Sequence, residues 1–146
     1  MINRFNAIRQ RTEYLCKPLE IEDYVPQSVV DVSPPKWHLA HTTWFFETFI
    51  LKPNHPDYKE FHPKYNYLFN SYYESVGDRV LRDQRGHMSR PTVADVYAYR
   101  SHVSEAMNQM AQKRGFDGLE DTLALGLQHE QQHQELLITD LKYMLA

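Results

Sequence analysis

The chain has 146 residues, of which 42% are hydrophobic and 24% are charged, and this length suffices for one domain that buries about 70% of its unfolded surface. Its 16 Lys and Arg against 19 Asp and Glu give a net charge of −3, which argues against nucleic acid or an anionic membrane as a partner. No apolar run approaches the roughly 18 residues of a membrane span, and the first residues lack the apolar core of a signal peptide. The single cysteine, Cys16, cannot form an internal disulfide, which is typical of a protein of the reducing cytoplasm.

The first half of the chain predicts two helices, and no stretch alternates apolar and polar residues long enough to indicate a strand. The first helix is expected over residues 3–17, ending at Pro18. The second is expected over residues 34–51, ending before Pro53. We expect the hydroxyl of Ser33 to cap the second helix, because prolines follow it in the first turn, where their missing N–H groups cost little.

Two further helices are predicted in the second half. Thr92 and Asp95 have the spacing of a capping box, and an apolar stripe continues from them to a stop at Gly115. The stripe consists of Val96, Tyr99, Val103, Ala106 and Met110. The last helix is expected over residues 119–146. Four helices in one small domain predict an all-α fold, most simply a four-helix bundle, in which metal or ligand sites lie between facing helices.

Residues 52–89, between the second and third predicted helices, have no clear periodicity and form a long aromatic-rich segment. Such a segment is too long for a simple connection in a bundle, so we expect it to be a loop that is functional or docked on another surface. Core packing or domain docking is the favoured role of its aromatic residues, with stacking on a substrate as the alternative. They include Tyr58, Phe61, Tyr65, Tyr67, Phe69, Tyr72 and Tyr73.

The motif HEQQH in the last helix places His129 and His133 four residues apart, so both imidazoles lie on one helical face within reach of a single ion. At about 100° per residue, this face also carries Leu125, Leu136 and Leu137, and we therefore expect both rings to point into the bundle. Two desolvated imidazoles in one layer are costly unless each finds a partner, and a shared metal ion satisfies both.

The same letters match the zinc-peptidase pattern H-E-x-x-H, in which the glutamate activates a metal-bound water. A peptidase of this kind needs a third ligand downstream. Only the carboxylates of Glu135 and Asp140 follow; Glu135 points to nearly the opposite side of the helix from His133, and Asp140 lies too close along the same helix. The sequence therefore disfavours a peptidase.

The motif WHLAH in the second helix offers a third ligand from upstream. His41 shares a face with Trp37 and Phe45, and His38 lies about 60° round the helix from it. Either histidine could reach the metal, and the spacing alone does not choose between them. It also does not distinguish iron from zinc.

Four distinctive runs cover almost the whole chain: SPPKWHLAHTTWFFETFIL, YNYLFNSYYESVG, QRGHMSRPTVADVYAYRSHV and LGLQHEQQHQELLITDLKYML. In this order they resemble the amino-terminal DinB-like four-helix domain of hercynine oxygenase, the sulfoxide synthase of ergothioneine biosynthesis. The resemblance implies that His41, His129 and His133 hold a non-haem iron, Fe(2+), with zinc or nickel as alternatives in the isolated protein. A set of three imidazoles leaves coordination positions open for a substrate and dioxygen.

The resemblance further implies an oxidoreductase that uses O2 to join a cysteine-type thiol to trimethylhistidine (hercynine), leaving a sulfoxide. An ovothiol-type synthase, which uses histidine itself as the acceptor, shares the same domain. Two alternatives stand outside this reaction. One is a stand-alone DinB-like metalloprotein, such as a thiol-dependent transferase or hydrolase with zinc or nickel, and the other is a non-catalytic binding module.

Four arginines without a lysine among them lie at the end of the aromatic-rich segment and just after it: Arg79, Arg82, Arg85 and Arg90. Guanidinium groups suit planar carboxylates, although the residues alone favour a solvated loop paired with Asp78 and Asp83. The resemblance implies that Arg82 and Arg85 bind the carboxylate of the thiol substrate. It also implies that Gln132 contacts trimethylhistidine.

Residues 1–146 are expected to form a single DinB-like domain. In the family that it resembles, a second domain, similar to the formylglycine-generating enzymes, supplies the other wall of the active site, and the chain ends before it. We therefore expect this chain to bind iron but to need a separate catalytic domain or subunit for turnover of hercynine.

Overall fold

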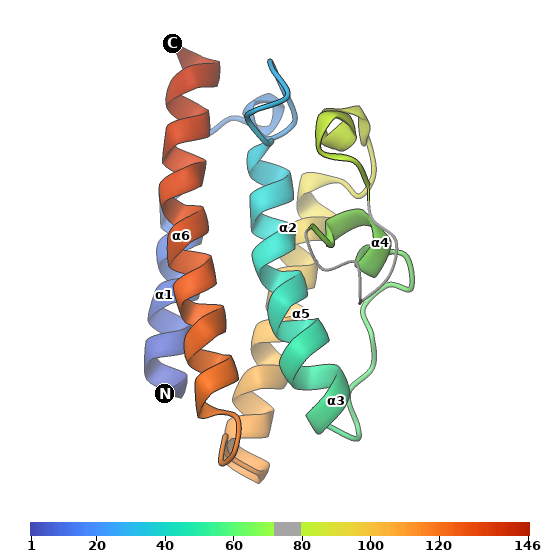
Figure 1. Cartoon of the computed structure of the whole chain (residues 1–146), viewed down its shortest axis with the longest axis vertical. Coiled ribbons are helices and arrows are strands. Elements are labelled where there is room, and N and C mark those ends of the chain that lie inside the picture. The colour runs from blue at the N-terminus through green and yellow to red at the C-terminus, as the bar shows by residue number, and fades with distance from the viewer. Residues whose placement is uncertain (72–79) are drawn as a thin grey trace.

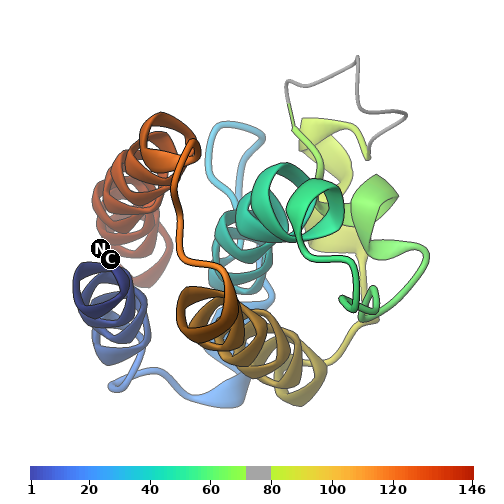
Figure 2. The same ribbon diagram turned by 90° about the horizontal axis from the view of Figure 1, so that it is seen from below.

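Four long helices form the body of the protein, for which the computed structural model describes residues 1–71 and 80–146 (Figure 1). They are α1 (Ile2–Leu15), α2 (Pro35–Phe46), α5 (Val93–Lys113) and α6 (Glu120–Leu145). In Figure 1, α1 and α6 run upward, whereas α2 and α5 run downward, and Figure 2 shows the four helices surrounding a common core. The described residues contain no strand. The predicted all-α fold with a four-helix bundle is confirmed.

The third predicted helix is confirmed in detail. The backbone N–H of Asp95 donates to the Thr92 hydroxyl at 3.1 Å, and the N–H of Thr92 donates to the Asp95 carboxylate at 3.0 Å, which completes the expected capping box. Gly115, with a φ of +72°, follows the helix in the left-handed conformation that glycine adopts most readily. All five residues of the predicted apolar stripe are buried.

The predicted cap of α2 is wrong. Its N-cap is Pro34, with no side-chain cap, so Ser33 stands one residue too early for its hydroxyl to meet the first turn. The N–H groups of Trp37 and His38 instead donate to the carbonyl of Pro34, at 2.9 and 3.2 Å. The Ser33 hydroxyl accepts a hydrogen bond from Arg85 at 3.0 Å, which places this serine in the site described below.

The predicted end of the second helix before Pro53 is also wrong. The helix continues through one π-helical turn, η2 (Glu47–Leu51), into the short α3 (Lys52–Asn54). Glu47, in this turn, is buried and accepts hydrogen bonds from the hydroxyls of Tyr58 and Tyr99. Single π-helical turns within α-helices are frequent at functional sites, and this one carries a buried carboxylate that two distant tyrosines hold in place.

The segment expected to be a loop contains short helices. Besides α3, it holds α4 (Tyr65–Phe69) and the 3-10 helix η4 (Arg82–His87), and another 3-10 helix, η1 (Ile21–Tyr24), joins α1 to α2. Tyr65 and Phe69 are buried against Tyr99 of α5, with ring centroids 4.9 and 6.4 Å apart. Tyr58 and Phe61 also pack against the core, whereas Tyr67 is exposed. Tyr72 and Tyr73 lie outside the described residues.

A buried ionic network joins all four long helices. Arg9 of α1 donates to Glu130 of α6 at 2.6 Å and to the Thr43 hydroxyl of α2 at 2.8 Å, and Arg100 of α5 lies 3.5 Å from Glu130. Burial alone would raise the pKa of Glu130, but the two guanidinium groups outweigh it and lower this pKa. Glu130 therefore lies in the bundle as a carboxylate that holds the helices together.

Close packing between α2 and α6 brings the histidines of these helices together. A Cβ atom at Gly126 would lie 2.7 Å from the ring of Phe46 and 2.9 Å from that of Phe45, so only glycine fits at this point of α6.

None of the helices among the described residues combines the length and apolarity that a membrane crossing needs.

Candidate metal centre

Three histidines converge where α2 and α6 face each other. His41 of α2 and His129 and His133 of α6 each offer a ring nitrogen, and these three atoms all lie within 4.8 Å of one another. The Nε2 atoms of His41 and His129 are 3.1 Å apart. A metal ion binds each imidazole nitrogen at about 2 Å, so nitrogens this close together can share one ion. The side chains present therefore fit a divalent metal.

Two tryptophan rings and one hydrogen bond fix the orientation of the His41 ring. Its ring stacks between Trp37 and Trp44, with centroids 4.3 and 5.5 Å away, and its Nδ1 lies 2.6 Å from the carbonyl oxygen of Phe69. A carbonyl only accepts, so Nδ1 carries the proton and Nε2 keeps its lone pair. That nitrogen faces the two histidines of α6.

The face of α6 that carries the histidines lies at the edge of the bundle, and the expectation that it points into the bundle needs correction. Leu137 is buried, but Leu125 and Leu136 are 55% and 40% exposed, and His129 and His133 are only partly buried. The reason is that α6 turns the side of Glu130 toward the core. The histidines therefore open onto a cavity.

Burial keeps the three imidazoles neutral. It lowers the pKa of His129 to about 4, and together with the neighbouring histidines it lowers those of His41 and His133 well below the ordinary value. Metal ligands must be deprotonated. The three rings therefore meet a metal ion at neutral pH without having to lose a proton.

The metal-free protein should lose stability as the pH falls from 6.5 to about 4. An unfolded histidine binds its proton near pH 6.5, whereas folded His129 binds it near pH 4, so the unfolded state holds more protons in this window and gains from acidification. Urea unfolding at several pH values in the presence of a chelator measures the effect. The free energy of unfolding should change less steeply with pH after His129→Phe. An equal change with pH in the two proteins would contradict the lowered pKa of His129.

The histidines line a cavity of about 410 Å³ that also brings together the other residues predicted from the sequence. Arg82 and Arg85 of η4 and Gln132 of α6 line it. His38, the alternative ligand of the second helix, also lines it, as does Asp140, which the sequence disfavours as a ligand. The other lining residues, which come from several elements, had no predicted role in binding: Asp31, Ser33, Trp37, Ser71 and Leu136.

Arg85 is buried in this cavity and held on several sides. Its guanidinium carbon lies 3.5 Å from the centre of the Trp37 ring, a cation–π arrangement, and its two terminal nitrogens donate to the hydroxyls of Ser33 and Ser71 at 3.0 and 3.1 Å. These contacts fix a positive charge beside the histidines.

The other arginines are placed differently. Arg82 lines the cavity but is exposed, and it donates to the backbone carbonyls of Val30 and Asp31 at 3.2 and 2.8 Å. Arg90 does not line this cavity. Arg79 and its suggested partner Asp78 lie outside the described residues.

The structure gives the peptidase interpretation no support. Glu130, the glutamate of HEQQH, is fully buried and paired with Arg9 on the other side of α6, so it cannot activate water at the histidines. Glu135 is exposed and, as the sequence predicts, does not belong to the cluster.

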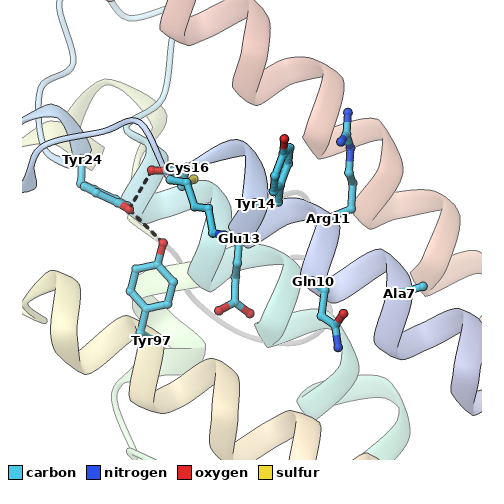
Figure 3. A pocket seen from close by; sticks show the side chains of 9 residues that line it. Ala7, Gln10, Arg11, Glu13, Tyr14, Cys16, Tyr24 and Tyr97 are labelled. Carbon is cyan, nitrogen blue, oxygen red and sulfur yellow. Dashed lines mark hydrogen bonds between the residues drawn. The ribbon is translucent and has the colours of Figure 1, made fainter.

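A larger cavity, of about 740 Å³, lies between α1, η1 and α5 (Figure 3). The Tyr24 hydroxyl there contacts the Tyr97 hydroxyl at 2.9 Å and donates to the Cys16 carbonyl. Burial raises the pKa of the Cys16 thiol to about 11, so this thiol is not a reactive nucleophile. None of the described residues that line this cavity is a histidine, and the histidine cluster remains the candidate site.

The protein is a helical bundle whose candidate metal site lies between two facing helices, a common place for metal and ligand sites in such bundles. The DinB superfamily matches residues 4–137, and the chain belongs to this family. No curated protein matches the chain significantly.

Proposed function

We propose that this chain is the iron-binding domain of a non-haem iron sulfoxide synthase, which joins a cysteine-type thiol to trimethylhistidine with O2 in ergothioneine biosynthesis. The proposal combines the family membership with the resemblance of the four sequence runs. In this role His41, His129 and His133 hold the iron, which, when bound, supplies oxygen activation and a position for the thiol sulfur.

The observation that carries the proposal is that one cavity contains all six residues that the resemblance implies. The three histidines, the two arginines and Gln132 come from α2, α6 and η4, yet they line the same space. A structural role for η4 alone would not require its arginines to face the histidines.

The chain's own residues would bind and orient the thiol substrate. Arg85, fixed over Trp37, presents a rigid cation that suits a carboxylate. Arg82 would add a second contact from the exposed rim. Gln132 is exposed beside His133 and would contact the trimethylhistidine substrate.

The described residues enclose the cavity only in part, since Gln132 and Leu136 line it and are also exposed. Within the proposal, a separate catalytic domain or subunit covers this side and supplies the remaining substrate contacts. The single cysteine is consistent with the reducing cytoplasm as the compartment.

The test is the response of the metal-loaded chain to a thiol. The protein is loaded with Fe(II) under anaerobic conditions, and cysteine or γ-glutamylcysteine is added while the absorption spectrum is recorded. We expect a new thiolate-to-metal charge-transfer band that saturates with the thiol. Serine, which has a hydroxyl in place of the thiol, is the matched control and should give no band.

The variant Arg85→Gln should retain the metal and require a higher thiol concentration for the same band. A chain that takes up zinc in preference to iron and shows no thiol response would contradict the proposal. That result would favour a stand-alone DinB-like metalloprotein.

A further inference from the structure

His38 lies directly behind the candidate metal centre and is not one of its three histidines. It is 3% exposed. Its Nδ1 lies 2.9 Å from the Nδ1 of His133, and its Nε2 lies 2.7 Å from Oδ2 of Asp140. Asp140, His38 and His133 therefore form a continuous chain of hydrogen bonds that leads from α6 through α2 and back to α6.

The protons in this chain can be assigned because each contact needs one donor and one acceptor. The Asp140 carboxylate only accepts, so Nε2 of His38 donates to it. A neutral imidazole carries one N–H group, so when Nε2 of His38 donates to Asp140, Nδ1 of His38 is an acceptor. Nδ1 of His133 is then the donor, and the lone pair of His133 is left on Nε2.

The Asp140 carboxylate, at the start of this series of hydrogen bonds, is itself held in place. Oδ2 of Asp140 also accepts the backbone N–H of Ser33 at 3.0 Å, just before the first turn of α2. Asp140 is 7% exposed. The hydrogen bond from Ser33 holds this carboxylate oxygen next to His38.

His41 reaches the same state by a different contact. The Phe69 carbonyl holds the proton on Nδ1 of His41, and His38 would hold the proton on Nδ1 of His133. In both residues the outer partner fixes the tautomer and leaves Nε2 free for a metal, which is how groups behind a metal site commonly orient its ligands.

We propose that His38 and Asp140 are positioning residues that set the tautomer of His133, so that His133 binds the metal through Nε2. This inference rests on the proposed metal site, and it adds two residues to which the family resemblance assigns no role.

The first measurement uses the unaltered chain. In the zinc-loaded protein with 15N-labelled histidine, long-range 1H–15N spectra distinguish a protonated ring nitrogen from a metal-bound one. We expect His133 to show a protonated Nδ1 and a zinc-bound Nε2. Coordination of His133 through Nδ1 would overturn the inference.

The second measurement compares zinc affinities by competition with a chelator. His38→Leu should weaken binding by about 10–100-fold, the usual cost of removing a group behind a metal ligand, with the stoichiometry still one ion per chain. Asp140→Asn, a smaller change that keeps the side-chain shape, should weaken binding in the same direction. His55→Phe removes another buried histidine, 9% exposed, outside the site and should leave the affinity unchanged.

The outcomes separate the two proposals. Absence of zinc binding by the unaltered chain would overturn the proposed metal site itself. Tight binding by the unaltered chain together with equal affinity of His38→Leu and Asp140→Asn would overturn only the positioning role.

Discussion

Replacing Glu130 with alanine should lower the free energy of unfolding by about 3–5 kcal/mol, which is the usual cost of removing one partner of a buried ion pair. Glu130 is fully buried and accepts hydrogen bonds from Arg9 at 2.6 Å and from the Thr12 hydroxyl at 2.9 Å. Burial lowers the pKa of Arg9 only to about 10, so this guanidinium stays charged at neutral pH and would lose its partner inside the bundle.

Urea unfolding of Glu130→Ala and Glu135→Ala at neutral pH measures this effect with a matched control. Glu135 lies on the same helix but is exposed, and its replacement should change the free energy of unfolding by no more than about 0.5 kcal/mol. A domain has only about 5–15 kcal/mol of stability, so the Glu130 variant should be close to unfolding. A loss below about 1 kcal/mol would show that the ionic network does not hold the helices together.

Replacing His129 with alanine should weaken metal binding by more than the roughly 10–100-fold that changes behind a metal ligand cost. The variant loses one of three nitrogens that lie within 4.8 Å of one another. The fold should be retained, because His129 is only partly buried and its Nδ1 has no hydrogen-bond partner among the described residues.

Chelator competition with Zn(II) or Co(II) measures this loss, and circular dichroism checks the fold. His62→Ala serves as the control, since His62 is exposed and stacks on Tyr65 away from the cluster. Equal losses in the two variants would mean that the affinity does not come from the histidine cluster.

The helices that the sequence predicts well are those whose signals are local. The capping box of Thr92 and Asp95 and the apolar stripe behind it lie within one helix, and both were found where expected. The end of the second helix was misjudged because its cause is not local. The π-turn at Glu47 contains a carboxylate that is held by Tyr58 and Tyr99, which lie 11 and 52 residues further along the chain.

The site shows the same division between local and distant causes. The spacing of His129 and His133 predicts a shared face, and the structure places both rings in one cluster. The spacing does not choose between His38 and His41, because the contact that orients His41 comes from the carbonyl of Phe69, 28 residues away.

The sequence contains one indication of the role of His38, which is the position of Asp140. Asp140 follows His133 by two helical turns and so lies on nearly the same face. This position is unsuitable for a third metal ligand, because Asp140 lies too close to His133 along the same helix. In the structure it is the hydrogen-bond partner of His38, a role that becomes visible only when α2 and α6 are placed side by side.

The most direct test of the account is the metal content of the purified chain after anaerobic titration with Fe(II). We expect one equivalent of tightly bound metal in the unaltered protein and none in the double variant His41→Ala, His129→Ala. Failure of the unaltered chain to bind metal, or one equivalent retained by the double variant, would contradict it.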